Sequence, residues 1–584
     1  MADFCTDAIY SEEYVDYLVE YVRGGPSSIN EVYDVSCSQI ASDRFAVIYQ
    51  EGGKYTSDEL AGIKLLPRCY GLLSSEEVLT SSGVTRVRRQ PGLDLYGTGV
   101  IIGFVDTGID YSHPAFIGSD GRTRILSIWD QTKENLSEGE KRPEDFFYGV
   151  EYTQEDIDHA LESDDPLGVV PSRDRNGHGT FLAGIACGGQ IEEKSFSGVA
   201  PLAQICVVKC KEAKQNLRDY YFIGNDVPCY AETDIMLGIR YLWLQAVKRR
   251  TPLIICLGMG TSQGSHDRGG ILGQFLQEYG DYRGVFCVTA GGNEGNAAHH
   301  YRSPMIEIDG ETEVELKVGA KENGFSMELW TDSPDLYAVA LISPDGEYSG
   351  RTEARLGESR RIPFLFTNTV VYIDYLIVSA ESGDECIRIR FENPLEGIWK
   401  IRVFNANNYS GFFDLWLPIR NFITDETYFL RPDPDITICD PSNNIGVITC
   451  SYYNSLNRSE AIESGRGYTR TQNIKPNFAA PGNAVYGTLP FAGNYPANEE
   501  ERTDRARFGY RSGSSYAAAV TAGCVALLAQ WALIERNDIG MDTNAANKYL
   551  IRGAQRQGML NVPNRTWGNG TLDIYGVFDS LRPR

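Results

Sequence analysis

The sequence predicts an α/β fold: a mostly parallel sheet flanked by helices, with a small α+β unit before it and a β-sandwich inserted into it. Continuous apolar runs recur between residues 99 and 290, as expected for parallel strands that are covered on both faces. Helical stretches separate these runs, and alternating strands and helices are typical of an open parallel sheet. Residues 303–432 break the alternation with closely spaced short strands and turn signals, which are typical of a β-sandwich.

The N-terminal segment, residues 1–85, has its own pattern. Tyrosine and aliphatic residues between Tyr10 and Val22 recur at helical spacing and predict a helix. Residues 44–50 (RFAVIYQ) predict a strand, and a Gly-Gly turn follows. Residues 73–83 are polar and predict a linker. We therefore expect a small α+β domain joined to the core by this linker.

The core is expected to occupy residues 86–302 and 433–584. Strands are predicted at residues 99–105, 205–208, 253–257 and 285–289, and helices at residues 178–187 and 233–248. The most apolar stretch, residues 517–534, contains Thr521, Gly523 and Gln530. These interruptions favour a buried core helix over a membrane span.

The insertion between the two parts of the core is expected to be all β. Strands are predicted at residues 314–318, 325–330, 337–342, 370–379, 386–391, 398–404 and 411–417. Neither flank is a long Gly/Ser-rich or Pro-rich linker. We therefore expect the insertion to pack against the core rather than to hang from it as a tethered module.

Charge and composition exclude several classes of protein. The 584 residues include 54 Lys and Arg against 79 Asp and Glu, a net charge of −25. Such a chain lacks the basic face that phosphate or anionic lipid requires, so neither nucleic acid nor a membrane is an expected partner. The first twenty residues contain no Lys, no Arg and no apolar run typical of a signal peptide. The chain is expected to be made in the cytoplasm.

The 13 cysteines form no CxxC pair and no Cys/His spacing suited to zinc. Reduced, buried thiols are the favoured interpretation, and a disulfide framework is the alternative. Carboxylates are plentiful but lack the spacing of an EF-hand, which leaves calcium binding open. No metal site and no cofactor is predicted, and the sequence leaves the oligomeric state open.

Two candidate catalytic residues stand at the ends of predicted core elements. Asp106 lies in Val-Asp-Thr-Gly just after the first apolar run, where open α/β sheets place their ligands. Aspartic proteases share Asp-Thr-Gly but need two facing copies, and this chain has one. His178 lies in Asn-Gly-His-Gly-Thr, between glycines that let backbone approach closely. Taken singly, each residue also fits a structural role, as a helix cap or a satisfied histidine.

Ser515 and Asn293 supply two further functional groups. Ser515 opens the long apolar helix, where backbone N–H groups and the helix dipole stabilise an oxygen that gains negative charge. Asn293 lies in Gly-Gly-Asn-Glu-Gly after a predicted strand, and its amide can donate to an oxyanion. Singly, such a serine is most often a helix cap and such an asparagine a turn residue.

Together the four residues fill the roles of serine-nucleophile catalysis. The nucleophile Ser515 needs a base, His178, and the base needs an orienting carboxylate, Asp106. Asn293 and the backbone N–H of Ser515 are predicted to bind the oxyanion. The chain order Asp, His, Ser is that of subtilisins and differs from the orders of α/β-hydrolases and chymotrypsins.

The motifs resemble those of the subtilisin-like serine proteases. The segments DTGID, NGHGTFLAG, AGGNEG and SGSSYAAA match the four signatures of that family, and FAAPG at residues 478–482 also matches. The resemblance implies a serine endopeptidase that acts on a protein or peptide substrate. It also implies that two segments bind the substrate: Leu257, Gly258, Met259 and Gly260, and Ala290, Gly291 and Gly292. Both segments are small or apolar and carry no carboxylate for a basic side chain.

Two positions depart from the family's pattern. Ser514 stands before the nucleophile where the family usually has threonine, and Ala519 stands where it usually has proline. A serine keeps the hydroxyl of threonine, and the loss of a proline near a helix start need not break the helix. Neither departure removes a catalytic group.

A narrower similarity, to clostridial spore germination proteases of the Csp type, rests on the insertion and on the C-terminal segments at residues 527–533 and 567–581. It implies that residues 1–85 are a prodomain that acts as an intramolecular chaperone and that the insertion is jelly-roll-like. It also implies proteolytic activation of a spore cortex-lytic proenzyme, packaging in the spore, and the chain's own prodomain as a partner. We expect self-cleavage between Tyr70 and Arg89. Some relatives lack triad residues and act in germinant sensing, so a catalytically silent regulator is the alternative.

Overall fold

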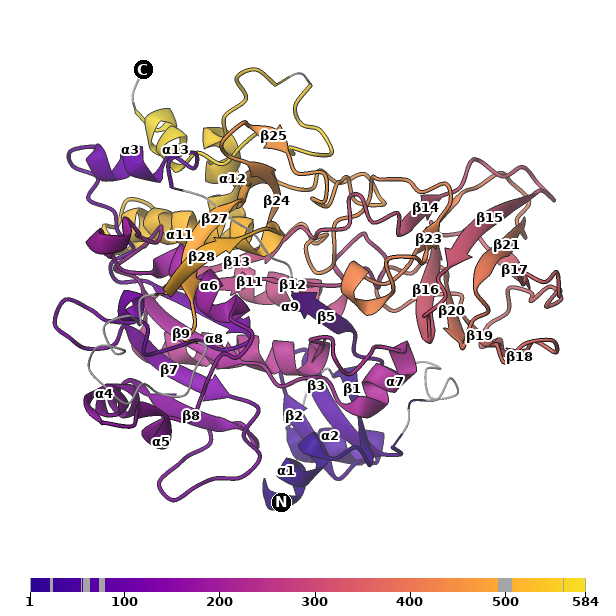
Figure 1. Ribbon diagram of the computed structural model, residues 1–584, viewed down its shortest axis with the longest axis horizontal. Coiled ribbons are helices and arrows are strands. Elements are labelled where there is room, and N and C mark those ends of the chain that lie inside the picture. The colour runs from indigo at the N-terminus through magenta and orange to yellow at the C-terminus, as the bar shows by residue number, and fades with distance from the viewer. Residues whose placement is uncertain are drawn as a thin grey trace.

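The computed structural model describes residues 2–21, 25–53, 55, 64–72, 79–491, 507–559 and 561–582. Its centre is a nine-stranded sheet in the order β25-β24-β13-β11-β6-β9-β7-β8, with β26 beside β24 (Figure 1). All pairs are parallel except β7–β8 and β24–β25. The strands are β6 (Ile101–Asp106), β7 (Ile125–Asp130), β8 (Val150–Thr153), β9 (Gln204–Lys209), β11 (Leu253–Leu257), β13 (Val285–Ala290), β24 (Ile448–Asn454), β25 (Ser459–Glu460) and β26 (Phe478–Asn483).

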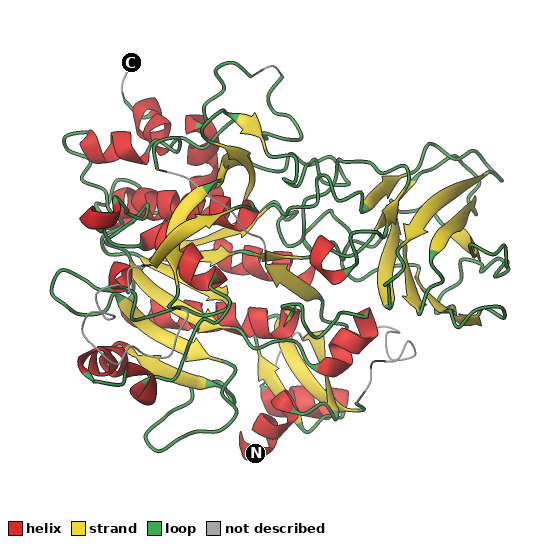
Figure 2. Cartoon of the chain, in the orientation of Figure 1, coloured by secondary structure: helices red, strands yellow, loops and turns green. Residues whose placement is uncertain are grey.

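Helices cover both faces of this sheet, which confirms the α/β prediction (Figure 2). Along β6, Ile102 and Phe104 face one hydrophobic core, with α6 (His178–Cys187) and α11 (Ser514–Ala529), while Ile101 and Val105 face the other, with α8 (Glu232–Arg249) and α9 (Gly270–Gly280). Because the central strands β6, β11 and β13 are buried at every position, they consist mainly of apolar residues. Further helices are α3 (Val84–Arg89), α4 (Gln154–Glu162), α5 (Pro166–Val169), α7 (Gln215–Tyr221), α12 (Thr543–Gly553) and α13 (Ile574–Ser580).

The helix α11 and the turn after it form the most apolar helical stretch of the described chain. The segment Ser514–Ile534 is long and apolar enough to cross a membrane by length and composition, yet 83% of its most apolar window is buried inside the protein. Every residue of α11 itself is buried. This burial confirms the predicted core helix.

The insertion is a sandwich of two antiparallel sheets that share one hydrophobic core. It lies to one side of the central sheet in Figure 1. The first sheet holds β14 (His300–Arg302), β22 (Phe413–Trp416), β16 (Gly324–Thr331), β20 (Cys386–Glu392), β19 (Val370–Leu376) and β18 (Ser359–Pro363). The second holds β17 (Tyr337–Ile342), β21 (Gly397–Asn405), β15 (Glu311–Val318) and β23 (Tyr428–Phe429). The seven predicted strands are present, and β14, β18 and β23 are additional.

The insertion is docked on the core by buried polar and aromatic contacts. Arg470 of the core is 2% exposed and pairs with Asp332 and Asp384 of the insertion. His266 of the core stacks on Trp416 of the insertion, with ring centroids 4.1 Å apart and planes 6° from parallel. These contacts agree with the expectation of a packed insertion.

The N-terminal residues form a small α+β unit with a four-stranded antiparallel sheet in the order β2-β3-β1-β4. Its elements are α1 (Ala2–Tyr10), β1 (Tyr14–Glu20), α2 (Pro26–Tyr33), β2 (Cys37–Ile40), β3 (Phe45–Glu51) and β4 (Lys64–Leu65). The predicted strand at residues 44–50 is confirmed as β3. The predicted helix between Tyr10 and Val22 is wrong, because β1 occupies most of that stretch.

The burial of β1 explains this error. Leu18 packs with helix α8, whereas Val15, Tyr17 and Val19 pack on the opposite side with Cys69 and helix α7. Since both faces are covered, β1 lacks the alternation that identifies a half-buried strand, and its apolar residues also fit a helical period.

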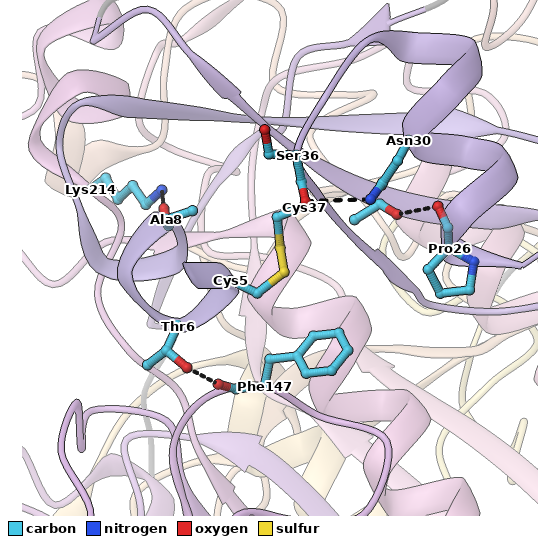
Figure 3. The surroundings of a disulfide bond; sticks show 10 residues. Cys5, Thr6, Ala8, Pro26, Asn30, Ser36, Cys37, Phe147 and Lys214 are labelled. Atoms are coloured by element: carbon cyan, nitrogen blue, oxygen red, sulfur yellow. Dashed lines mark hydrogen bonds between the residues drawn. A yellow bond between two sulfur atoms is a disulfide. The ribbon is translucent and has the colours of Figure 1, made fainter. Parts of the chain in front are cut away.

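One disulfide lies in the N-terminal unit, between Cys5 on α1 and Cys37 on β2 (Figure 3). The other eleven cysteines, all within the described residues, are free and buried. The prediction of reduced thiols therefore needs correction at this one pair. Close to the disulfide, the Thr6 hydroxyl donates to the Phe147 carbonyl at 2.7 Å and joins this unit to the core (Figure 3).

Candidate active site

The nucleophile candidate stands at the start of a core helix. Ser515 is the second residue of α11 and is fully buried. The preceding Gly513 has a φ of 151°, which side-chain-bearing residues rarely adopt, so glycine allows the chain to turn sharply into the helix. The hydroxyl of Ser515 therefore lies at a helix N-terminus, where the dipole favours negative charge.

His178 begins helix α6 and lies between the serine and the aspartate. Its Nε2 is 3.1 Å from Oγ of Ser515, and its Nδ1 is 2.8 and 3.0 Å from the two carboxylate oxygens of Asp106. A carboxylate only accepts hydrogen bonds, so Nδ1 carries the proton and Nε2 is free to accept one from the serine hydroxyl. The three side chains are 1% exposed or less.

Asp106 ends strand β6 and is fixed by its neighbours. The backbone N–H of Thr107 donates to its Oδ1 at 2.8 Å. The Thr107 hydroxyl donates to Asp174 at 2.8 Å, and Asp174 also accepts from Gly177 N–H at 2.7 Å and from Thr180 N–H at 2.9 Å. Asp174 thus links the loop after β6 to the first turn of α6, which carries the histidine.

Two glycines allow the backbone to approach the triad. A Cβ on Gly258 would stand 3.0 Å from Cβ of Ser515 and 3.1 Å from Cε1 of His178. A Cβ on Gly179 would collide with the carbonyl of Gly108 and stand 3.2 Å from the Asp106 side chain. A larger residue at either position would displace the side chains of Ser515, His178 or Asp106.

The loop after β13 brings Asn293 to the start of α11. The backbone N–H of Ser514 donates to Oδ1 of Asn293 at 3.0 Å. With the oxygen engaged, the NH₂ end of the amide is the group left to donate to a reacting carbonyl. The hydroxyl of Ser514 accepts from Gly292 N–H at 3.0 Å, so the serine that replaces threonine keeps this link.

The predicted substrate-binding segment 257–260 forms the edge of a three-stranded sheet, β10-β5-β12. Strand β12 (Met259–Gly260) and strand β10 (Tyr230–Ala231) both belong to the core. Between them lies β5 (Cys69–Leu72) from the N-terminal segment, antiparallel to both. Met259 pairs with Leu72 and directly follows Gly258, the glycine whose added Cβ would stand 3.0 Å from Cβ of Ser515. The N-terminal segment therefore occupies the place beside the predicted substrate-binding strand β12 where a substrate would be expected to pair, and we call this place the cleft.

The second predicted segment lies behind the nucleophile as part of the same loop as Asn293. The carbonyl of Ala290 accepts from the Ser442 hydroxyl at 2.7 Å, and Gly291 exchanges backbone hydrogen bonds with Cys450 and Cys439. A Cβ on Gly292 would stand 2.5 Å from Sγ of Cys439, so this position also requires glycine. These contacts hold the Asn293 loop in place.

All four residues that the sequence selected for catalysis meet at one point. Sequence reasoning missed Asp174, whose only signal was its position four residues before His178 in a polar loop. It also missed the cleft strand β5 and its partner β10, because pairing between residues 160 apart leaves no local pattern. Within the described residues, no cluster of three or more His, Cys, Asp or Glu side chains is suited to a metal ion.

This fold and this arrangement of groups define a subtilisin-like serine protease. The sequence matches the subtilase family (Peptidase_S8) over residues 97–570, and the chain belongs to that family of serine endopeptidases.

Among solved structures, the chain is similar to the CspB protease of Clostridium perfringens. The two share 30% identity and a TM-score of 0.74, over 86% of this chain and 96% of that one. Fervidolysin of Fervidobacterium pennivorans shares the fold, with a TM-score of 0.50 and 14% identity over 98% of this chain and 62% of that one.

Sequence relatives are more distant. The chain is 25% identical to the subtilisin-like protease SBT2.2 of Arabidopsis thaliana over 76% of its length and 55% of the relative's. It is 26% identical to a subtilisin of Bacillus sp. strain TA39 over 42% of its length and 46% of the relative's. The chain thus spans about half the length of these two proteins.

Proposed function

We propose that this protein hydrolyses peptide bonds with Ser515 as nucleophile, His178 as general base and acid, and Asp106 as the group that orients the imidazole. The observation that carries the proposal is the pair of contacts on His178: 2.8 Å from Nδ1 to Asp106 and 3.1 Å from Nε2 to Ser515. This geometry lets the imidazole remove the serine proton as the hydroxyl attacks and return it to the leaving amine.

The oxyanion of the tetrahedral intermediate would lie between the Asn293 amide and the backbone N–H of Ser515. Both groups are held before the reaction begins, Asn293 by Ser514 N–H and Ser515 by the start of helix α11. Donors that need not reorganise stabilise the transition state more than the ground state.

We further propose that the protein cuts itself between the N-terminal unit and the core, so that residues before the cut act as its prodomain. Strand β5 supports this, because it lies antiparallel between two core strands and leads toward Ser515. The predicted window, Tyr70 to Arg89, includes residues 73–78, which lie outside the described residues. Since β5 is paired through Leu72, the cut is expected after that residue.

For the physiological substrate we propose a spore cortex-lytic proenzyme, with the protease made in the cytoplasm and packaged in the spore. Support comes from the similarity to the CspB protease, which covers 86% of this chain and 96% of that one at 30% identity. Incubating the purified protein with such a proenzyme and sequencing the new N-terminus tests this assignment.

A fluorophosphonate probe, which reacts only with an activated serine, tests the catalytic proposal. Labelling should be strong in the self-processed protein, absent in Ser515→Ala and His178→Ala, and unchanged in Ser512→Ala, a nearby exposed serine whose hydroxyl donates to Asn483. If the folded wild-type protein is not labelled even after its N-terminal segment is removed, the catalytically silent regulator becomes the function to pursue.

A further inference from the structure

A buried arginine of the cleft-filling segment is held by carboxylates from two other parts of the protein. Arg68 directly precedes β5, and its side chain is 8% exposed. Its Nη1 donates to Oδ2 of Asp440 in the core at 3.1 Å. Its guanidinium also pairs with Glu381 in the loop between β19 and β20 of the insertion. Arg68 thus joins the N-terminal segment, the core and the β-sandwich.

The pocket around the guanidinium is built for a cation of this size. Asp440 is fully buried, and its other oxygen accepts from the Asn443 amide at 2.6 Å. A Cβ on Gly264 or Gly270 would collide with the guanidinium, so both glycines leave room for it. Burial raises the pKa of Asp440 to about 6, and the charge of Arg68 opposes that rise. A cation in the pocket therefore stabilises a carboxylate that is otherwise unfavourable there.

The backbone of Arg68 continues the register of the cleft strand. Its N–H donates to the Glu232 carboxylate at 3.2 Å, and its carbonyl accepts from Glu232 N–H at 2.9 Å. The second of these bonds, between backbone groups, follows on from the pairs Cys69–Ala231 and Tyr70–Tyr230 of strands β5 and β10. The arginine is thus held as one residue of an extended peptide in the substrate cleft.

The register relates this pocket to the nucleophile. Leu72 pairs with Met259, and a Cβ added to the neighbouring Gly258 would stand 3.0 Å from Cβ of Ser515. A peptide bound in this register would bring its next residue beside Ser515, and the position of Arg68 is five residues before that one. Counted back from the scissile bond, the arginine stands at the sixth position.

We infer that Asp440 and Glu381 form a substrate subsite for a basic side chain at the sixth residue before the cut. The inference rests on the proposed protease function, with β5 lying as a substrate does. A substrate can enter only when β5 leaves, and Arg68 then leaves with it. Asp440 and Glu381 lose their cation unless the substrate brings another, and removing one partner of a buried ion pair is costly. Arginine fits better than lysine, because a planar guanidinium can contact two carboxylates at once.

This subsite gives the insertion a part in choosing the substrate. The segments beside the nucleophile carry no carboxylate, whereas Glu381 reaches the cleft from the β-sandwich. Ser265 N–H donates to Glu381 at 3.4 Å and helps to hold it there. Selection by charge therefore acts far from the reacting bond.

The test compares two quenched fluorescent peptides with the self-processed protein. One peptide carries residues 66–75 of the chain, and its twin carries glutamine at the position of Arg68. The arginine peptide should be cut with a kcat/KM at least about tenfold higher, as expected for a close charge pair in a buried interface. Equal rates for the two peptides would overturn the subsite.

Substitutions at Glu381 test whether the insertion causes the preference for the arginine peptide. Glu381→Gln should reduce the preference for arginine several-fold, and Glu381→Asp, which keeps the charge, should retain most of it. Glu396→Gln, the same change at an exposed site of the insertion, should keep the full preference. Thermal melting shows that each variant is folded. A Glu381→Gln protein that melts normally and keeps the full preference would refute a role for the insertion.

The probe separates this inference from the proposed function. If Ser515 is labelled but neither peptide is cut, the catalytic proposal stands and the subsite fails, because a peptide copied from the cleft strand should bind. If Ser515 is not labelled either, both proposals fail.

Discussion

The hydroxyl of Ser514 lies 3.0 Å from the backbone nitrogen of Gly292, whose N–H donates to it. Ser514 also donates its own N–H to Asn293, so one residue holds the loop that carries Asn293 at two points. If Asn293 binds the oxyanion as proposed, Ser514 acts as a positioning residue for it. The hydroxyl of Ser514 makes the hydrogen bond to Gly292, and a threonine at this position would also supply a hydroxyl.

Ser514→Ala should lower kcat by about tenfold with little change in KM, because the Gly292 N–H loses its buried acceptor and the loop carrying Asn293 loosens. Stability should fall by about 1–3 kcal/mol. Steady-state kinetics and thermal melting measure the two effects. Ser514→Thr should retain most activity, and a Ser514→Ala protein with unchanged kcat would contradict the positioning role.

Asn293→Ala should reduce kcat by roughly 10²–10³ through lost oxyanion stabilisation, with substrate binding nearly unchanged.

Asp106→Asn should reduce the rate by around 10⁴, a magnitude measured for the chymotrypsin-type triad, because the wrong imidazole tautomer then faces Ser515. Peptide hydrolysis rates test both. Wild-type rates in both folded variants would refute the catalytic assignment.

Self-processing should remove residues up to a cut after Leu72 and before Arg89. The expected products are two fragments in wild type and one intact chain in Ser515→Ala, as read by intact mass and N-terminal sequencing. Trimming of Ser515→Ala to the same extent as wild type would show that another protease makes the cut. A cut on the N-terminal side of Leu72 would contradict the cleft register.

The insertion and the core should unfold together. Arg470→Ala leaves the largely buried carboxylate of Asp384 without its ion-pair partner, and breaking a buried pair costs on the order of 3–5 kcal/mol, whereas the more exposed Asp332 adds little. Calorimetry should show one transition at a lower temperature. Arg351→Ala, at a half-exposed pair with Glu353, should change the midpoint little. Limited trypsinolysis that frees residues 303–432 as a stable fragment would argue for an independent module.

Stability should depend on pH through Glu385. Burial raises the pKa of this carboxyl to about 8, against about 4.3 in an unfolded chain. Between these two pH values the folded protein holds a proton that the unfolded chain releases. The contribution of Glu385 to the free energy of unfolding is therefore fully present below about pH 4.3 and is lost as the pH rises through 8.

Glu385→Gln removes this titration. The variant should unfold much like wild type near pH 5 and be more stable by on the order of 2–4 kcal/mol at pH 8. Denaturant unfolding at the two values measures the difference. The exposed Glu396→Gln serves as the matched control, and an equal pH slope for Glu385→Gln and wild type would show that Glu385 is already ionised in the folded protein.

The sequence predicted the features that depend on local pattern. Asp106, His178, Asn293 and Ser515 stand in short motifs at the ends of buried elements, and the central strands are apolar on both faces, so both the triad and the parallel sheet could be inferred. Strand β1 was mistaken for a helix because burial on both faces removed its alternation.

Features that depend on long-range pairing left no such pattern. Arg68 pairs with Glu381 and Asp440, which lie 313 and 372 positions further along the chain. The cleft strand β5 pairs with β10 and β12, which lie far along the sequence. Neither relationship could be predicted before the fold was known.

The position of β5 between β10 and β12 determines how inhibition would respond to dilution. In the intact chain the strand is tethered to its own cleft, so its effective concentration there is fixed by the connecting segment and is the same at any protein concentration. A cut after Leu72 would turn the same contacts into a complex of two molecules, which dilution can dissociate. The newly processed enzyme would therefore show a lag before peptide hydrolysis reaches its full rate, and the lag would shorten as the sample is diluted. During this lag, release of the strand rather than peptide hydrolysis would limit the observed activity.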